Sequence, residues 1–296
     1  MLYYLTAARQ AGAMAYFLQT SGKALAKRIH VVPYEQILAA GATLRLPRGT
    51  YIFSGLEIGL GTRYPPAPLR RAAIELHARL VELHGPDKVL NHPERTLNRY
   101  ELLRALHACG MNAFNAYHPG ERPQRYPVFL RPGPGTLQAE PELIYSEAGY
   151  HAALALEPTG HERVAIEFCD TADSAEIYRK YGAFVIGGEV IPRHLFFSRT
   201  WFVKSADLTA PELVREELAY LEQNPHAEAL RLACRVAQIG YGRVDYALLD
   251  GKPQIWEINH TPTVATPPPA EIDLRKAVHQ RFTELFTAAL DRLETG

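Results

Sequence analysis

The segment from residue 240 to residue 262 constrains the fold more than any other part of the chain, because it has the pattern of a β-hairpin. Two runs with strand-like alternation, residues 243–249 and 254–259, flank the dipeptide Asp250-Gly251. That dipeptide favours a tight turn between antiparallel strands. A polar strip with a proline, residues 260–263, ends the second run. We therefore expect an antiparallel pair of strands near the C-terminal end.

The spacing along this hairpin gathers polar side chains on one face. Side chains alternate faces along a strand, so Arg243 shares a face with Asp245, and Glu257 with Asn259. A three-residue turn places Asp245 opposite Glu257 and Arg243 opposite Asn259, whereas a two-residue turn shifts the pairing by one residue. Carboxylate and amide oxygens suit a Mg²⁺ ion that also contacts phosphates. An exposed hairpin held by ion pairs gives the same pattern, so both interpretations stay open.

The rest of the chain alternates between predicted strands and helices. Apolar runs predict strands at residues 1–5, 29–32, 51–53, 128–130, 164–168 and 183–191, the last folded back at Gly187-Gly188. Helical spacing predicts helices at residues 11–25, 68–84, 99–107 (closed by Gly110), 143–156, 211–223 (capped by Thr209), 226–239 and 270–293. This order favours a mixed α/β and α+β fold that begins with a Rossmann-like layer of parallel strands.

Composition excludes several classes of protein. Lys plus Arg equals Asp plus Glu at 32 each, a balance that argues against a nucleic-acid partner. No apolar run approaches the ~18 residues of a membrane helix, and Arg9 interrupts the first apolar stretch, which reads poorly as a signal peptide. The cysteines, Cys109, Cys169 and Cys234, stand far apart, which predicts a reducing, cytoplasmic setting without disulfides. We expect no membrane partner, and a homodimer stays open as the assembly.

The closing hairpin resembles the C-terminal signature of ATP-grasp enzymes. The matching residues are Arg243-Val-Asp245, then Glu257-Ile-Asn259 followed by Pro262. In that family the Asp, Glu and Asn hold Mg²⁺ ions bound to ATP, and the Arg contacts the phosphates and an acyl-phosphate intermediate. The resemblance therefore implies that Asp245, Glu257 and Asn259 are the metal ligands and that Arg243 is the catalytic residue.

Other segments resemble the same family in the same order, over residues 91–266. Asn91-His92-Pro93 and the helix after it resemble the opening of the ATP-grasp module, residues 126–131 its first phosphate-contacting strand, and residues 165–168 the strand that holds adenine by its backbone. The resemblance implies ATP-binding roles for Arg99, Arg131, Glu167, Phe168, Asp170 and Lys180, and substrate or phosphate contacts for His194 and Lys204. For several of these the plain alternative is structural: a turn-forming Asp170, a surface Lys180 and a buried His194.

Two features depart from the family pattern. ATP-grasp enzymes usually have Lys at the positions of Arg99 and Arg131, and Arg is not interchangeable with Lys at a phosphate site. The flap at residues 132–136 is short and carries two prolines. Both departures concern nucleotide affinity and flap closure, and neither touches the metal residues.

The resemblance implies a fold of three parts and a reaction. We expect an N-terminal Rossmann-like domain over residues 1–90, a lid-side ATP-grasp subdomain over 91–165, and a C-terminal subdomain with the metal site over 166–296. The implied function is an ATP- and Mg²⁺-dependent ligase that joins a small-molecule or peptide carboxylate to an amine or a thiol through an acyl phosphate. An ATP-grasp phosphotransferase (kinase) and a non-catalytic nucleotide-binding protein are the alternatives. Loops at residues 62–68 and 260–269 are expected to line the acceptor pocket, and Cys169 reads as a small buried hydrophobe.

Overall fold

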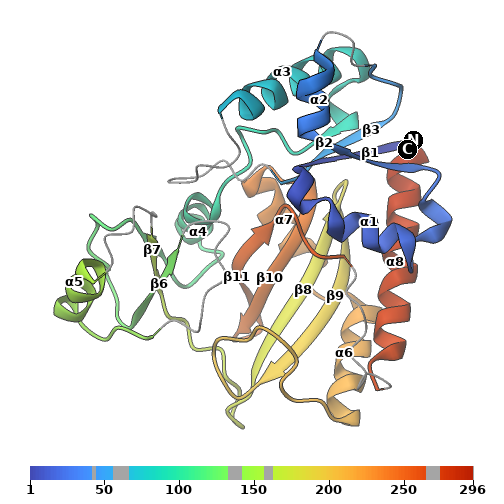
Figure 1. The fold of residues 1–296 in the computed structure, drawn as a ribbon. Helices are drawn as coiled ribbons and strands as arrows, with labels where there is room; N and C mark the ends of the chain where they lie inside the picture. The colour runs from blue at the N-terminus through green and yellow to red at the C-terminus, as the bar shows by residue number, and fades with distance from the viewer. Residues whose placement is uncertain (42–44, 56–66, 133–141, 157–162, 265–273, 296) are drawn as a thin grey trace.

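The strands that the structure describes form three sheets (Figure 1). The computed structural model describes residues 1–41, 45–55, 67–132, 142–156, 163–264 and 274–295. The parallel sheet has the order β2-β1-β3-β4, the central antiparallel sheet β11-β10-β8-β9, and the small antiparallel sheet β5-β7-β6. Their bounds are β1 Leu2–Thr6, β2 Ile29–Pro33, β3 Thr50–Phe53, β4 Val89–Leu90, β5 Ala116–Tyr117, β6 Val128–Pro132, β7 Arg163–Glu167, β8 Tyr178–Ile186, β9 Glu189–Ser198, β10 Tyr241–Leu249 and β11 Lys252–Asn259.

The described helices pack against these sheets, and α4 lies between the small sheet and the central sheet (Figure 1). They are α1 Gly12–Gln19, α2 Tyr34–Ala40, α3 Ala67–His84, α4 Arg99–Ala108, α5 Glu147–Ala155, α6 Pro211–Gln223, α7 Ala227–Ala237 and α8 Lys276–Thr295. Within the described part of the chain, every helix is too short or too polar to cross a membrane.

The N-terminal sheet is parallel, as its short apolar strands predict. Helices α2 and α3 pack on one face through Ile37, Leu76 and Leu80, which join Leu5 and Phe53 of the strands in one apolar cluster. The opposite face carries Leu2, Tyr4 and Ile52, which belong to the main core. The layer is therefore sandwiched, and one side of it merges with the rest of the molecule.

The central sheet has two differently covered faces. On one face, Tyr246 donates a hydrogen bond to Tyr220 of α6 at 3.0 Å, and α6 and α7 cover that side. On the other face, Phe184 packs edge-on against Phe286 of α8, with ring centroids 4.9 Å apart. Arg243 is the register partner of Phe184 and shares its face. The part of this face beyond α8 carries the polar side chains described below.

Asn91 joins the parallel sheet to the central sheet. It is buried, and its backbone adopts φ 64°, a left-handed conformation that Asn tolerates well. Its side-chain amide donates to the carbonyls of Phe53 (3.0 Å) and Tyr241 (2.7 Å), and its oxygen accepts from the amides of Gly240 (2.8 Å) and Tyr241 (3.0 Å). One side chain thus satisfies backbone groups of β3 and of the start of β10.

The hairpin turn has two residues, not three. Asp250 (φ 50°) and Gly251 (φ 74°) adopt the left-handed conformations of a two-residue hairpin turn. The register near the turn is therefore shifted by one, but Trp256 stands outside the ladder as a β-bulge, and the pairing resumes with Asp245 opposite Glu257. The expected pairing of the polar face is present because the bulge compensates for the shorter turn.

Other boundaries differ for local reasons. The helix expected over residues 11–25 ends at Gln19, and a 3-10 turn follows after Gly22. The strands of the Gly187-Gly188 hairpin are longer than expected, because pairing with β9 extends β8 through the polar residues 178–181. Lys180 therefore lies inside β8 instead of preceding it.

Three helices differ from the prediction at their N-terminal ends, and a fourth helix was not predicted at all. Helix α6 has Ala210 at its N-cap without a side-chain bond, so Thr209 is not the cap. Helix α5 begins at Glu147, four residues later than expected, because Ser146 caps it and Ile144 pairs with β6. Helix α8 begins at Lys276, and residues 270–273 of the expected helix lie outside the described residues. Helix α2 was not predicted.

We predict that Asn91→Ala destabilises the protein by about 3 kcal/mol or more, because it leaves several buried backbone groups without partners. Urea denaturation of both proteins measures this difference in the free energy of unfolding. Asn98→Ala is the matched control: Asn98 only caps α4, so its loss should cost about 1 kcal/mol. Equal losses for the two variants would contradict the bridging role of Asn91.

Candidate functional site

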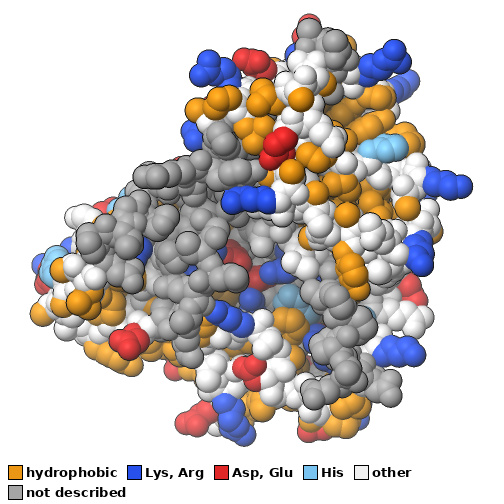
Figure 2. Space-filling view, in the orientation of Figure 1, with side chains coloured by type: hydrophobic (Ala, Val, Ile, Leu, Met, Phe, Trp, Pro, Cys, Tyr) orange, Lys and Arg blue, Asp and Glu red, His pale blue; other side chains and the backbone are white. Residues whose placement is uncertain are grey.

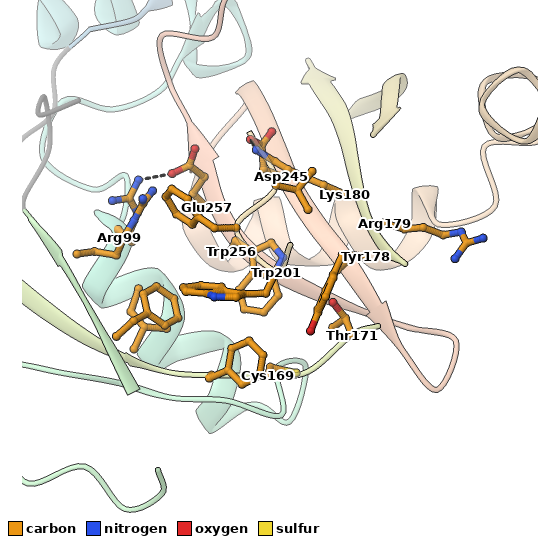
Figure 3. A pocket seen from close by; sticks show the side chains of 17 residues that line it. Arg99, Cys169, Thr171, Tyr178, Arg179, Lys180, Trp201, Asp245, Trp256 and Glu257 are labelled. Carbon is orange, nitrogen blue, oxygen red and sulfur yellow. Dashed lines mark hydrogen bonds and ion pairs between the residues drawn. The ribbon is translucent and has the colours of Figure 1, made fainter. Parts of the chain in front are cut away.

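A pocket lies between the small sheet and the central sheet (Figure 3). One end is aromatic and the other is charged. Its lining residues are Arg99, Phe129, Arg131, Ile166, Phe168, Cys169, Thr171, Tyr178, Arg179, Lys180, Trp201, Phe202, Val203, Asp245, Ala247, Trp256 and Glu257. In the space-filling view, Lys, Arg, Asp, Glu and His side chains gather in a hollow over the central sheet (Figure 2).

The aromatic end is built by side chains from separate parts of the chain. Trp201 comes from the loop after β9. Its ring centroid lies 4.9 Å from that of Phe129 in β6 and 5.4 Å from that of Phe168, which it meets edge-on. Trp256, the bulged residue of β11, stacks on Phe114 with ring centroids 4.5 Å apart. These rings form flat apolar walls, which suit a planar ring system better than a flexible chain.

At the charged end, Asp245 is held by two cations. The residue is 1% exposed, and its carboxylate accepts from Arg243 Nε at 2.6 Å and Nη2 at 3.0 Å and lies 2.9 Å from Lys180 Nζ. Burial by itself raises the pKa of the Asp245 carboxyl, but Arg243 and Lys180 outweigh burial and hold that pKa far below its usual range. The carboxylate is therefore ionised at neutral pH.

Glu257 faces the same side as Asp245 and has its own cation. Arg99, from the first turn of α4, donates to Glu257 Oε2, and Figure 3 shows the two side chains meeting at the pocket wall. Burial and the neighbouring Asp245 raise the pKa of the Glu257 carboxyl, but the charges of Arg99, Lys180 and Arg131 together hold it below its ordinary value. Arg131 lies close by, with its guanidinium carbon 5.2 Å from the centre of the Phe202 ring. Burial and the neighbouring Arg99 lower the pKa of Arg131 to about 10.

Neither carboxylate is forced to take a proton. Two adjacent carboxylates repel each other, which raises the pKa of one of them unless cations compensate. The structure provides that compensation for Asp245 through Arg243 and Lys180, and Arg99 does the same for Glu257. The two acids therefore keep their charges next to each other.

A row of four residues crosses the central sheet at the site. His194 of β9 pairs with Gly182 of β8, Gly182 with Asp245 of β10, and Asp245 with Glu257 of β11. Gly182 has no side chain, and the His194 ring fills its place: a Cβ on Gly182 would lie 2.5 Å from His194 Nε2. The row therefore brings the predicted residue His194 next to the predicted metal residues.

Other predicted residues lie elsewhere or have structural partners. Glu167 does not line the pocket: its carboxylate accepts from Tyr117 (2.8 Å) and Arg125 (2.6 Å), which holds the small sheet together. Asp170 accepts from the amide of Ala172 at 3.1 Å, which is the turn-forming role that we set beside the functional one.

The remaining predicted residues divide between the pocket and its margins. Phe168 lines the pocket. Lys204 lies 4.8 Å from the centre of the Phe202 ring, outside the lining. Asn259 pairs with Arg243 across the hairpin, as expected, and its side-chain oxygen accepts from the amide of Thr261 at 2.7 Å. Residues 133–136 of the flap and most of the two expected acceptor loops lie outside the described residues.

Some pocket residues were not singled out from the sequence. Trp201 and Trp256 are the clearest, since the chain has two Trp residues and both face the pocket. The small number of Trp residues could have singled them out from the sequence, but no sequence feature indicates the bulge that turns Trp256 toward the pocket. Cys169 lines the pocket, and burial raises its thiol pKa to about 11, so it is not a reactive thiolate at neutral pH. The described cysteines are all free.

Solved structures with a similar fold match almost the whole chain. A D-alanine–D-alanine ligase from Bacillus anthracis, complexed with ATP, matches 99% of this chain and 98% of its own at 10% identity, with a TM-score of 0.50. The ATP-grasp ligase PsnB, complexed with a minimal precursor, matches at 12% identity and a TM-score of 0.52, covering 99% of this chain and 98% of its own. The chain has the ATP-grasp fold.

A further ATP-grasp neighbour is the macrocyclase MdnC from Microcystis aeruginosa MRC, bound with the precursor peptide MdnA. It matches at 11% identity with a TM-score of 0.51, covering 96% of this chain and 99% of its own. No family model and no curated protein matches the sequence itself.

We predict that the stability contributed by Asp245 depends on pH. The Asp245 pKa is lower in the folded state than its unfolded value of about 3.9, so its contribution is complete above pH 4 and declines as the pH falls further. Asp245→Asn should therefore cost several kcal/mol at pH 7, and the gap to the wild type should shrink by about 1 kcal/mol at pH 3. Urea denaturation at both pH values measures the gap. Asp250→Asn, in the turn of the same hairpin, is the control, and a pH-independent gap for Asp245→Asn would refute the pairing.

Proposed function

We propose that the protein is an ATP- and Mg²⁺-dependent ligase that activates a carboxylate and joins it to an amine or a thiol. One observation carries the proposal: a single pocket joins a flat aromatic end to a charged end where two ionised carboxylates face each other among several cations. An aromatic slot suits a purine base, and a cation-rich end suits a polyphosphate. The ATP-grasp fold is consistent with this use of the pocket.

The proposed roles follow from position. Phe168, Trp201 and Trp256 would enclose the adenine ring. Arg131 and Lys180 would contact the phosphates from opposite sides of the pocket, since Arg131 lies on β6 and Lys180 on β8. Arg131 has a planar, bidentate donor set and stacks on Phe202, which holds its guanidinium in the pocket. The substitution of Arg for the usual Lys therefore keeps the phosphate-binding charge.

The residues present fit a Mg²⁺ ion. The candidate ligands are Asp245, Glu257 and Asn259, which lies two residues after Glu257 on the same face of the sheet. All three offer hard oxygen atoms. Glu257 is the most available, because only its Oε2 is bonded by Arg99, whereas Asp245 accepts from both Arg243 and Lys180. When bound, the ion would neutralise phosphate charge and orient the phosphates. Arg99 would then turn from Glu257 toward the phosphates.

The chemistry needs positioning and charge neutralisation, not a side-chain nucleophile. In the proposed reaction the substrate carboxylate attacks the γ-phosphate, ADP leaves, and the acceptor displaces phosphate from the acyl phosphate. Arg243 would stabilise the transferred phosphoryl group, because Asp245 fixes its guanidinium at two points at the centre of the sheet face. Named relatives of the fold act on amino acids or are seen with precursor peptides, which supports a small-molecule or peptide carboxylate.

One observation favours a second candidate, a nucleotide-binding protein without turnover. The charged end is already neutralised internally, since Arg99 occupies Glu257 and two cations occupy Asp245. An ion must compete with these partners for both carboxylates. Binding of ATP and ADP without release of phosphate, in the presence of carboxylates and amines, would support this candidate over the ligase.

We predict that Arg131→Ala weakens binding of Mg·ADP and Mg·ATP at least tenfold, since it removes a positive charge from the phosphate end, while the fold is retained. Arg131→Lys should keep part of the affinity, because a point charge still meets phosphate. Isothermal titration calorimetry measures both affinities, and thermal unfolding monitors the fold. The exposed Arg122, paired with Glu147, gives the control variant Arg122→Ala. If Arg131→Ala binds like the wild type, Arg131 is not a phosphate ligand.

The reaction itself is tested by the products. Purified protein with Mg·ATP and a panel of amino-acid and peptide pairs should release ADP and phosphate only when both a carboxylate and an acceptor are present. A stable phosphorylated product without an acceptor would instead identify a kinase.

A further inference from the structure

Arg193 is a buried guanidinium that no described carboxylate bonds; the charge of Glu217 acts on it, but Glu217 is bonded to Arg275. Arg193 is 8% exposed, and no hydrogen bond or ion pair joins it to the described part of the chain; its guanidinium carbon lies 4.2 Å above the Phe282 ring of α8. An aromatic face compensates only part of the cost of burying a charge. Burial, followed by the charges of Arg243 and Arg275, lowers the pKa of Arg193 to about 10. The group is nevertheless charged at neutral pH.

The neighbouring arginines are already neutralised. Arg243 is held bidentately by Asp245, and Arg275 by Glu217 of α6 at 2.8 and 2.6 Å. Among the residues that the structure describes here, three guanidiniums therefore share two carboxylates, and Arg193 is the one that neither carboxylate bonds. Such an excess of positive charge in a buried place is unfavourable unless an anion joins it.

Two histidines with unpartnered nitrogens lie in the same region. His194 is 5% exposed, and its Nε2 atom has no hydrogen-bond partner among the described residues. In the same part of the chain, Nε2 of His279 in α8 also has no partner, and the pKa of His279 falls to about 4 through burial and the charges of Arg193 and Arg275. Both rings are neutral at pH 7, so each Nε2 can carry a hydrogen and donate it. The region thus offers donors and a cation, and lacks the matching acceptor.

A backbone irregularity places Arg193 there. The ladder between β8 and β9 pairs Gly182 with His194 and then Ala183 with Pro192, which leaves Arg193 as an extra, bulged residue. The bulge lies beside the row that leads through Asp245 to Glu257. Arg193 is not part of the nucleotide pocket lining, although the charge of Arg243 acts on it. The bulge therefore sets a cation next to the phosphoryl-transfer residues but outside the proposed ATP site.

We propose that Arg193, with His194 and His279, binds a carboxylate group of the substrate, so that the enzyme acts on a molecule with a second, non-reacting carboxylate. The guanidinium supplies a bidentate fork for a planar carboxylate, and the histidines supply further donors. Arg243 and Asp245 stand between this subsite and Glu257, so the reacting carboxylate of the same molecule would lie toward Arg243. This assignment of a substrate class rests on the proposed function, but the binding of a carboxylate is testable without it.

The test uses succinate as a dicarboxylate probe, with acetate and inorganic phosphate as comparison anions, at constant ionic strength set with NaCl. Calorimetry and thermal unfolding are measured on the full chain. Succinate should bind the wild type saturably and raise its melting temperature more than acetate or chloride does. Arg193→Met, which keeps an apolar chain over Phe282, should melt higher than the wild type without ligand and bind succinate at least tenfold more weakly. Arg193→Lys should fall between the two.

Two controls separate this site from others. Arg292→Met removes an exposed arginine paired with Glu189, and it should leave succinate affinity unchanged. Arg131→Ala should lose nucleotide affinity and keep succinate affinity. If the wild type binds no nucleotide but binds succinate in a way that depends on Arg193, the proposed function is rejected and this subsite is retained.

Four results would overturn the proposal. One is that succinate binds the wild type no better than chloride does, and another is that it binds Arg193→Met as tightly as the wild type. A lower melting temperature for Arg193→Met without ligand would mean that the core stabilises the unpaired charge by itself. Inorganic phosphate binding that depends on Arg193, without succinate binding, would replace the carboxylate by a phosphate and reject the substrate class.

Discussion

The buried Asp245 carboxylate is the interaction on which the candidate site depends. A carboxylate with 1% exposure is tolerated only when donors surround it, and Arg243 and Lys180 supply three of them. These contacts fix the side chains of two adjacent strands, β8 and β10, on one face of the central sheet. The same contacts orient Arg243, which leaves its position free of the rotamer disorder typical of exposed arginines. Order at the centre of the site thus comes from the pairing of charges, not from apolar packing.

Two bulges lie next to this pairing, one on each outer strand of the sheet. The bulge in β11 releases Trp256, which enters the aromatic end of the pocket, and the bulge in β9 releases Arg193, which enters the polar region beside His194. Bulges are common next to active sites, where they redirect a side chain. The extra residues, Trp256 and Arg193, have large side chains. The bulges place these side chains where the regular alternation of a strand would not. The sheet thereby widens its polar face without adding a strand.

The sequence allowed the polar face to be predicted, but for an incomplete reason. The spacing of Arg243, Asp245, Glu257 and Asn259 correctly placed these residues together, although the turn has two residues, the length expected to shift this pairing. The shift in pairing caused by the shorter turn is reversed by the bulge at Trp256. An alternation pattern does not reveal that a single residue is left out of the pairing. The fold class also followed from the order of short apolar runs and the resemblance to ATP-grasp enzymes.

Residues whose roles depend on tertiary contacts were harder to predict. Glu167 stands in a strand beside the pocket, yet its carboxylate points to Arg125, a partner 42 residues away along the chain. Arg193 belongs to a run without a distinctive pattern, and its lack of a carboxylate is visible only when the surrounding helices are in place. Local spacing predicts which face a side chain occupies, but it does not predict which charges remain unbalanced. The metal and nucleotide roles stay proposals for the same reason.

Because Trp256 is left out of the strand pairing, the face on which Glu257 lies depends on whether an even or an odd number of residues is added to or removed from the hairpin. Loss of one residue between Asp245 and Glu257 either removes the bulge or moves Glu257 and Asn259 to the face covered by α6 and α7. A change of two residues preserves facing and only alters how far the turn extends. Related chains should therefore tolerate insertions and deletions in this hairpin in pairs, and a single-residue change should be accompanied by the gain or loss of the bulge. Sequence alignments that place one gap here would mark the point at which the bulge arose.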